Sequence, residues 1–202
     1  MDIGLYNMKY PVRKLISGVL PLMKDVNPNT VSWSMIPVGV AIAGCYYFAA
    51  QGQNVLYLVA IALTFLRMYL GTLDGLMAEH YKKGTPQGEM INRLTPELCD
   101  VMYLMAIAFS CFSHIFLGII VMAVAWLTTF AGLIGLTAQK KIQSVGPVGQ
   151  TDRLAALLVF TLLAYLSNQF HWGVDFVQIF LIWAVAGGIL TIILRLRRNL
   201  GN

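Results

Sequence analysis

Charged residues are scarce in this chain of 202 residues: Asp, Glu, Lys and Arg make up 11% of it, whereas hydrophobic residues make up 58%. A soluble domain carries about 25% charged residues, because charge keeps its surface in water. The scarcity of charge therefore excludes an ordinary soluble domain and predicts that lipid is the main solvent of the chain. The mean hydropathy of +0.70 agrees with this interpretation.

Cysteine and histidine are also rare, with three residues of each. Cys45, Cys99 and Cys111 lie in or at the edge of predicted helices without a metal-binding spacing, so we interpret them as small apolar packing residues. The histidines are scattered over different loops, which argues against a zinc site. The sequence has no internal repeat, low-complexity tract or Pro/Ser-rich linker, which predicts a single domain over residues 1–202.

Long hydrophobic segments, in contrast, are abundant. Four of them have almost no ionisable residues and approach the roughly 20 residues that cross a bilayer as a helix: residues 31–50, 115–137, 154–166 with their flanks, and 176–194. Two more, residues 55–77 and 90–111, contain polar residues. The sequence thus predicts an all-α integral membrane protein, with six transmembrane helices in a bundle over residues 27–202.

The basic residues predict the orientation of these spans. They precede the first span and follow the second, fourth and sixth: Lys9, Arg13, Lys14 and Lys24; Lys82, Lys83 and Arg93; Lys140, Lys141 and Arg153; Arg195, Arg197 and Arg198. The intervening loops contain no Lys or Arg, so with six spans all basic loops share one side, which the positive-inside rule assigns to the cytoplasm. We therefore expect both termini in the cytoplasm, a bacterial or archaeal cytoplasmic membrane as the location, and no nucleic acid partner for the net charge of +5.

Residues 5–23, within the first 26 residues, mix basic and apolar side chains before a polar break at residues 24–29. This composition suits an amphipathic helix lying in the cytoplasmic interface, with a disordered tail as the alternative. The residues Asn27, Pro28, Asn29 and Thr30 then predict a turn and an N-cap for the first span. No short cleavable signal sequence opens the chain, so we expect Met1 to remain.

Two predicted spans carry ionisable residues, and a charge within a bilayer is costly, so such residues are candidates for a functional cavity. At 100° per residue, one face of the second span presents four residues within about 60°: Arg67, Gly71, Asp74 and Ala78. One face of the third span presents four more within roughly 80°: Glu89, Asn92, Pro96 and Asp100. The short loop of residues 80–88 makes these faces near neighbours.

Carboxylate and amide oxygens are the ligands of hard cations, so these faces suit Mg²⁺, Mn²⁺ or Ca²⁺. The alternative is that the charged residues only neutralise one another near the interface. The small residues Gly71, Gly75 and Ala78 leave the same ambiguity, because they admit either a ligand or a packed neighbouring helix.

A second polar segment, GPVGQTDR, spans residues 146–153 after Lys140 and Lys141. Thr151 can cap the fifth span, Asp152 suits its positive N-terminal dipole, and Arg153 lies at the cytoplasmic mouth. The segment is interpreted either as a phosphate contact or as a capped loop that obeys the positive-inside rule.

The two polar spans carry a recognisable motif. Residues 71–96, GTLDGLMAEHYKKGTPQGEMINRLTP, resemble the pattern D-x2-D-G-x2-A-R-x8-G-x3-D-x3-D of the CDP-alcohol phosphotransferase family without a gap. Asp74, Gly75, Ala78 and Gly88 match it. Residues 27–31 and 146–153 also resemble segments of the family, so the resemblance extends from about residue 27 to residue 160.

Four motif positions differ: Gly71 replaces the first aspartate, Glu79 the arginine, Asn92 the third aspartate and Pro96 the fourth. In the family the four aspartates hold two divalent metal ions that bind the CDP pyrophosphate, and the fourth activates the acceptor hydroxyl. Asp100 lies one helical turn further on, where some bacterial relatives have an additional aspartate.

The resemblance implies attack of an alcohol hydroxyl on the CDP-linked phosphorus with release of CMP, in phospholipid biosynthesis. It implies Mg²⁺ or Mn²⁺ as the cofactor, a CDP-linked donor, an alcohol acceptor, contact with membrane lipid and a possible homodimer. It casts Asp74 and Asp100 as catalytic residues. It casts as metal ligands Asp74, Asn92, Asp100 and Glu97, and as substrate-binding residues Gly75, Ala78, Gly88, Lys140, Lys141 and Arg153.

Two other functions stay open on the sequence. The replacements Gly71, Glu79 and Pro96 favour a catalytically inactive relative that acts as a lipid-binding or structural membrane subunit. A small transporter or channel would need a polar path across the last three spans, and these show almost no polar residues.

Overall fold

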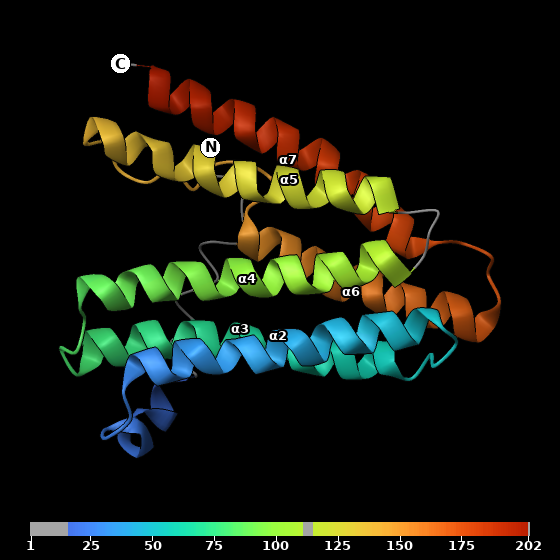
Figure 1. Ribbon diagram of the computed structural model, residues 1–202, viewed down its shortest axis with the longest axis horizontal. Helices are drawn as coiled ribbons and strands as arrows, with labels where there is room; N and C mark the ends of the chain where they lie inside the picture. The colour runs from blue at the N-terminus through green and yellow to red at the C-terminus, as the bar shows by residue number, and fades with distance from the viewer. Residues whose placement is uncertain (1–15, 111–114, 202) are drawn as a thin grey trace. The chain divides into compact units, whose positions relative to one another are not determined.

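The computed structural model describes residues 16–110 and 115–201, and these residues form helices and connecting loops without strands. The helices follow one another along the chain in this order: η2 (Ser17–Met23), α2 (Pro28–Ala50), α3 (Leu56–His80), α4 (Pro86–Ser110), α5 (Ile115–Leu133), η4 (Ile134–Ala138), α6 (Gln150–Phe170) and α7 (Phe176–Leu200). Figure 1 labels the α-helices. The prediction of an all-α chain is confirmed.

Five helical segments in the described residues are long and apolar enough to cross a membrane: Pro28–Ala50, Leu56–His80, Ile115–Thr137, Gln150–Phe170 and Phe176–Leu200. The helix α4 equals α3 in length, with 25 residues each. It is more polar because its first four turns carry Glu89, Arg93, Glu97 and Asp100. The membrane fold is supported, whereas α4 as a sixth span stays a prediction.

The chain forms two compact units, one within residues 7–106 and the other within residues 107–202. The boundary falls inside α4. The single domain expected over residues 1–202 stays a prediction.

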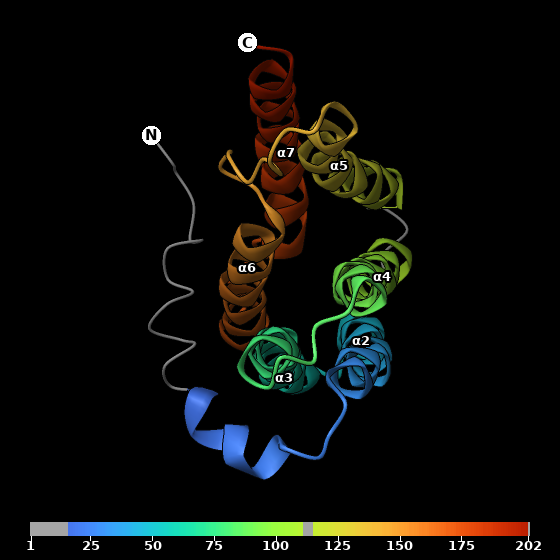
Figure 2. The ribbon, with the colours of Figure 1, turned by 90° about the vertical axis from the view of Figure 1, so that its left-hand side faces the viewer.

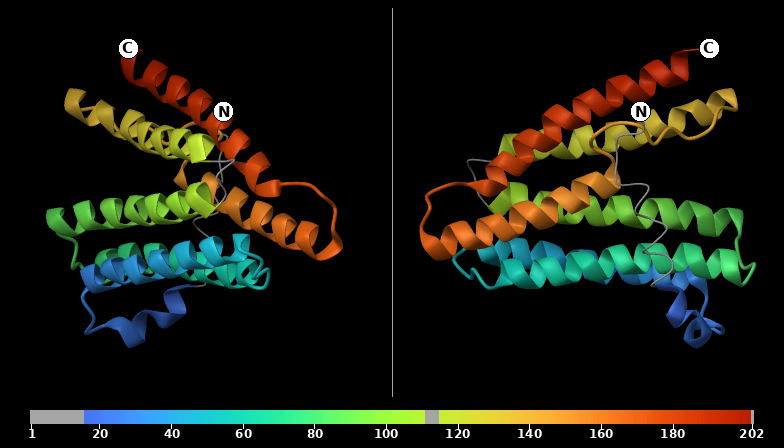
Figure 3. Two further views of the ribbon diagram at one scale, coloured as in Figure 1. Left: turned by 45° about the vertical axis from the view of Figure 1, so that its right-hand side comes forward. Right: turned by 180° about the vertical axis from the view of Figure 1, so that it is seen from behind.

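In the first unit, α2 begins at the turn that the sequence predicts. The side-chain oxygen of Asn27 accepts a hydrogen bond of 3.0 Å from the backbone N–H of Asn29, and Pro28 occupies the first helical position, which needs no N–H. The helix then packs along α3, as both views of Figure 3 show. The predicted N-cap is confirmed.

Small residues bring α2 and α4 together. A Cβ atom on Gly39 would lie 2.9 Å from the Sγ of Cys99, and this thiol donates a hydrogen bond of 3.2 Å to the carbonyl of Met35. Cys99 is therefore a packing residue, as expected, and the close approach requires glycine at position 39. Cys45 is half-buried, and Cys111 lies outside the described residues.

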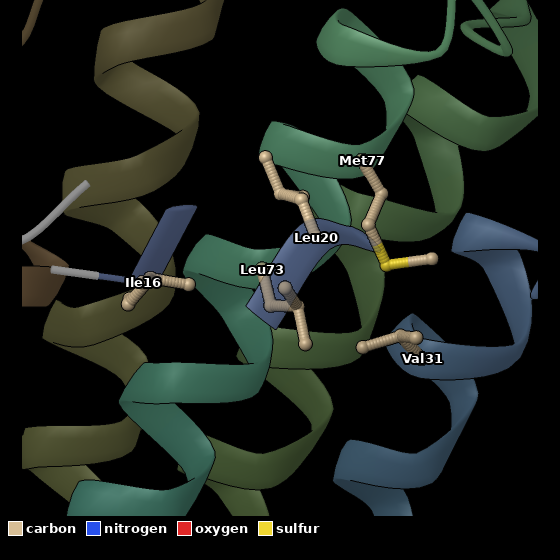
Figure 4. Packing of buried hydrophobic residues seen from close by; sticks show 5 residues of the cluster. All are labelled: Ile16, Leu20, Val31, Leu73 and Met77. Carbon is tan, nitrogen blue, oxygen red and sulfur yellow. The ribbon is translucent and has the colours of Figure 1, made fainter. Parts of the chain in front are cut away.

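The short helix η2 packs on the same unit. Figure 4 shows Ile16 and Leu20 beside Leu73 and Met77 of α3 and Val31 of α2, in one buried cluster. Residues 1–15 of the predicted interfacial helix lie outside the described residues, so a helix over residues 1–26 in the membrane interface stays a prediction.

In the second unit, α7 packs against both α5 and α6, and Figure 2 shows α5 and α7 side by side. A Cβ atom on Gly188 of α7 would overlap the side chain of Val124 of α5, so glycine permits this approach. The loop before α6 is fixed by α7. Arg195 donates to the carbonyls of Val145 at 2.9 Å and Thr128 at 2.6 Å.

Candidate functional site

A pocket of about 510 Å³ lies in the first unit, where α2 begins, α3 ends and α4 begins. Its lining consists mainly of the polar and small residues at these helix ends: Pro28, Asn29, Ser32, Asp74, Gly75, Ala78, Glu79, Lys83, Gly84, Thr85, Pro86, Gly88, Glu89 and Asn92. All four residues that match the sequence motif belong to this lining. The structure therefore brings the motif together around one cavity.

Asp74 is the most buried ionisable residue of the lining, with 1% of its surface exposed. Its Oδ2 accepts a hydrogen bond of 2.5 Å from the Oγ of Ser32 on α2, and its Oδ1 accepts one of 2.6 Å from the backbone N–H of Gly75. Hydrogen bonds to a charged acceptor are stronger than those between neutral groups. They hold the Asp74 carboxylate in a fixed orientation at the pocket wall.

The glycines of the motif have different surroundings. A Cβ atom on Gly88 would lie 2.8 Å from the Oδ1 of Asn29 and 3.1 Å from the Oγ1 of Thr85, so a side chain at this position requires these two side chains to shift. A Cβ atom on Gly75 would lie 3.6 Å from the Nδ2 of Asn92, an ordinary contact. Gly88 therefore allows α4 to approach α2, whereas Gly75 keeps the space beside Asn92 open.

The charged residues of the lining are three carboxylates and one lysine: Asp74, Glu79, Glu89 and Lys83. Glu89 forms an exposed ion pair of 2.6 Å with Arg93, one turn along α4. The ammonium of Lys83 donates to the carbonyl of Lys24 at 2.6 Å, so it fixes the connection before α2. With three carboxylates and one lysine, the lining is acidic. One of these carboxylates, Glu79, stands where the motif has an arginine.

Asp100 and Glu97 do not belong to the lining of this pocket. Asp100 instead forms a buried ion pair of 3.0 Å with Arg67, with side-chain exposures of 1% and 6%. The same guanidinium donates a hydrogen bond of 2.9 Å to the carbonyl of Pro96. Asp100 with Arg67 and Glu89 with Arg93 are thus ion-paired, as the alternative of mutual neutralisation requires, and whether these charges have no other role stays open. The metal-binding roles of Asp100 and Glu97 stay predictions.

The donor set does not fit a pair of metal ions. Gly71 and Pro96 have no side-chain oxygen, and a Cβ atom on Gly71 would lie 3.3 Å from the Sδ of Met35. Within residues 16–110 and 115–201, no group of three or more His, Cys, Asp or Glu side chains is placed to hold an ion. The lining carboxylates Glu79 and Glu89 are exposed, and Glu89 is ion-paired with Arg93. Asp74 and Asn92 are the less exposed oxygen donors of the motif in this lining, and they can contribute to one ion when a substrate supplies further oxygens.

The basic residues expected to bind substrate lie in the second unit. The ammonium of Lys140 donates to the carbonyls of Asn199 at 2.8 Å and Gly201 at 2.9 Å, at the C-terminal end of α7. Lys141 is exposed, and Arg153 is buried at the start of α6. Their contact with a substrate stays a prediction.

The prediction that Thr151 caps α6 is wrong, because the helix begins at Gln150 and Gly149 is its N-cap. Asp152 has the role expected of it, since its Oδ2 accepts a hydrogen bond of 3.0 Å from the N–H of Gly149. A carboxylate at this position also interacts favourably with the helix dipole.

Ser32 is a pocket residue that was not singled out from the sequence, and so are Gly84, Thr85 and Pro86 in the loop before α4 and at its start. Ser32 lies in an apolar segment, where a serine is usually a helix-packing residue. The signal available was its spacing, because Ser32 follows Pro28 by four residues and so shares a helix face with the predicted entry turn.

Comparison with known proteins supports the membrane fold. No family model matches the chain. The chain is 25% identical over 188 residues to the inner membrane protein YnbA of Escherichia coli (strain K12), which covers 90% of each protein. The structure of this chain is similar to that of the Mycobacterium tuberculosis phosphatidylinositol phosphate synthase PgsA1, which was crystallised with CDP-DAG bound. The TM-score is 0.73, with 13% identity and 94% of each chain covered. The chain is thus an integral membrane protein with the fold of that synthase.

Proposed function

We propose that this protein is a membrane-embedded CDP-alcohol phosphotransferase, which transfers a phosphatidyl or related phospho-alcohol group from a CDP-linked donor to an alcohol and releases CMP. The observation that carries the proposal is the placement of Asp74. This buried carboxylate lies in a pocket whose wall contains the other motif residues, Gly75, Ala78 and Gly88. The shared fold with a synthase crystallised with CDP-DAG supports it.

The proposed membrane placement follows from the same helices. We propose α4 as a sixth span, because its 25 residues are enough to cross a bilayer and its charged residues lie in its first four turns. The pocket end of α3 and α4 then faces the cytoplasm beside Lys82 and Lys83, and both termini lie on that side. In a bacterial cytoplasmic membrane, a water-soluble acceptor and a lipid donor both reach the pocket from there.

In the proposed reaction, the acceptor oxygen forms a bond to the lipid-linked phosphorus, the bond from this phosphorus to the bridging oxygen of CMP breaks, and Asp74 takes the hydroxyl proton. The hydrogen bond from Ser32 orients the Asp74 carboxylate. The open space beside Gly75 admits the pyrophosphate of the CDP-linked substrate. Asp74 and Asn92 would hold a Mg²⁺ or Mn²⁺ ion, whose positive charge would offset that of the pyrophosphate. Arg153, together with Lys140 or Lys141, is proposed to bind a phosphate of the acceptor.

The test is CMP release by the purified full-length protein with CDP-diacylglycerol, Mg²⁺ or Mn²⁺, and a panel of phosphorylated and free alcohols. We expect CMP with at least one acceptor and none for Asp74→Asn. The matched control is Asp25→Asn, because Asp25 is exposed and lies outside the pocket lining. Absence of CMP with every acceptor would contradict the proposal.

A second candidate function is a catalytically inactive lipid-binding or structural subunit. It is favoured by two of the three motif positions that lack their aspartate, since Met35 fills the space beside Gly71 and the carbonyl of Pro96 binds Arg67. This candidate predicts saturable binding of CDP-diacylglycerol without CMP release, and a cellular function that survives Asp74→Asn.

A further inference from the structure

Arg67 is a buried cation within a membrane-spanning helix, and such a charge requires a partner because lipid does not solvate it. Its Nη2 is 3.0 Å from the Oδ1 of Asp100 and 2.9 Å from the carbonyl of Pro96. Both acceptors belong to α4, so the guanidinium joins α3 to α4. Arg67 precedes Asp74 by seven residues, which places it about 10 Å further along the helix axis from the pocket.

Two residues near Arg67 stand at motif positions where the family has an aspartate and this chain does not. Pro96 stands at the fourth aspartate position, and Gly71, one turn after Arg67, stands at the first. The space beside Gly71 is filled by Met35, which is fully buried. The chain therefore lacks the two aspartate charges at positions 71 and 96, and it has the positive charge of Arg67 beside them.

We infer that Arg67 is the resident cation of the α3–α4 pair and excludes a divalent metal ion from Asp100. In the pocket, Glu79 and Glu89 are exposed and Glu89 is paired with Arg93, so we expect a single divalent ion there, at Asp74 and Asn92. That part of the inference deepens the proposed function, because we expect the ion to bind together with the pyrophosphate of the CDP-linked donor. The exclusion of metal from Asp100 depends only on the ion pair.

The ligand requirements of the ions support this assignment. Mg²⁺ and Mn²⁺ are held by several oxygens, and Mg²⁺ prefers six in an octahedral arrangement. Asp74 and Asn92 supply two side chains, and two turns beyond Asn92 on α4 the carboxylate of Asp100 already binds a guanidinium. The oxygens of a pyrophosphate would complete the coordination of one ion in the pocket, whereas the carboxylate of Asp100 is already paired with Arg67.

The first experiment counts ions in the wild-type protein. Mn²⁺ is titrated into the purified full-length chain in nanodiscs, with and without CDP-diacylglycerol, and unbound Mn²⁺ is measured by electron paramagnetic resonance. We expect no stoichiometric binding without the donor and one ion per chain with it. Two ions per chain in either condition would overturn the inference.

The second experiment removes the resident cation and needs no donor. In Arg67→Met, Asp100 loses its guanidinium partner and becomes available to metal, so we expect one more bound Mn²⁺ per chain than in the wild type and a melting temperature that Mn²⁺ raises. Arg67→Lys keeps the positive charge, and Arg67→Met/Asp100→Leu removes both charges, so neither should gain an ion. A folded Arg67→Met variant without the extra ion would show that Arg67 is only a structural partner of Asp100.

The two experiments separate this inference from the proposed function. If the wild type neither binds CDP-diacylglycerol nor releases CMP, the proposed function fails, and the Arg67 variants still decide the inference. If Arg67→Met does not fold, as judged by gel filtration, the wild-type ion count decides it: two ions overturn it, and one or none supports it.

Discussion

Ser32 on α2 donates a hydrogen bond of 2.5 Å to Asp74 on α3, a residue 42 positions further along the chain, and both residues are buried. In a low-dielectric site, one hydroxyl thus fixes the orientation of the carboxylate on which the proposed reaction depends. The relationship connects the entry turn of α2 directly to the motif.

Ser32→Ala should lower activity more than it lowers stability. Loss of a hydrogen bond to a charged group costs about 1.5–3 kcal/mol, so we expect a fall in CMP release of roughly tenfold or more, with CDP-diacylglycerol still bound. Ser34→Ala is the matched control, because the hydroxyl of Ser34 bonds to the carbonyl of Val31 in its own helix. Equal rates for the two variants would contradict an orienting role for Ser32.

The two motif glycines should respond differently to alanine. Gly88→Ala places a Cβ atom 2.8 Å from the terminal Oδ1 of Asn29, so the Asn29 side chain must shift, and we expect a destabilisation of about 1 kcal/mol in thermal unfolding, the low end of the usual cost of overpacking. Gly75→Ala meets Asn92 at 3.6 Å, so the protein should keep its melting temperature and bind CDP-diacylglycerol more weakly. A stable Gly88→Ala protein would show that α4 can shift away from Asn29.

In the second unit, Arg195→Met should loosen the loop before α6. The variant removes the hydrogen bonds from the guanidinium to the carbonyls of Val145 and Thr128, and a hydrogen bond to a charged group contributes about 1.5–3 kcal/mol. We expect a lower melting temperature and faster proteolysis within residues 139–149. Arg197→Met is the control, because Arg197 is exposed on the same helix. Unchanged proteolysis of the loop in Arg195→Met would argue against this anchor.

Substitutions of Lys140 and Lys141 should have different effects, because we expect Lys140 to be structural and Lys141 to contact the substrate. Lys140 binds the last carbonyls of α7, so Lys140→Gln should lower the melting temperature and leave the KM for a phosphorylated acceptor within about twofold. Lys141 is exposed, so Lys141→Gln should leave stability unchanged and raise that KM. The opposite assignment of effects would make Lys140 the acceptor contact.

The helices and the α2 cap were predictable from the sequence because apolar length and local capping residues depend on neighbours in the chain. The pairing of Arg67 was harder to predict. Helical periodicity placed Arg67 and Asp74 on one face, but it carries no information on the axial level of α4, where Asp100 lies opposite Arg67. Only the packed structure shows which carboxylate forms the ion pair with Arg67.

Ser32 and Thr151 illustrate the same limit. The contact of Ser32 with Asp74 depends on how α2 packs against α3, which no local spacing encodes. At the start of α6, Thr151 has a suitable side chain, but the extended backbone of Gly149 and the Asp152 carboxylate begin the helix two residues earlier. Local propensity was overridden there by a neighbouring carboxylate.

The packing of Met35 against Gly71 constrains how this sequence can change over evolution. The sulfur of Met35 lies 3.3 Å from the place of a Cβ atom at position 71, so an aspartate introduced there meets a buried side chain of α2. The effects of substitutions at positions 35 and 71 on the free energy of unfolding are therefore non-additive. A smaller residue at position 35 makes room for an aspartate at position 71. A lineage of this protein that acquired an aspartate at position 71 should show a change at position 35 that came first.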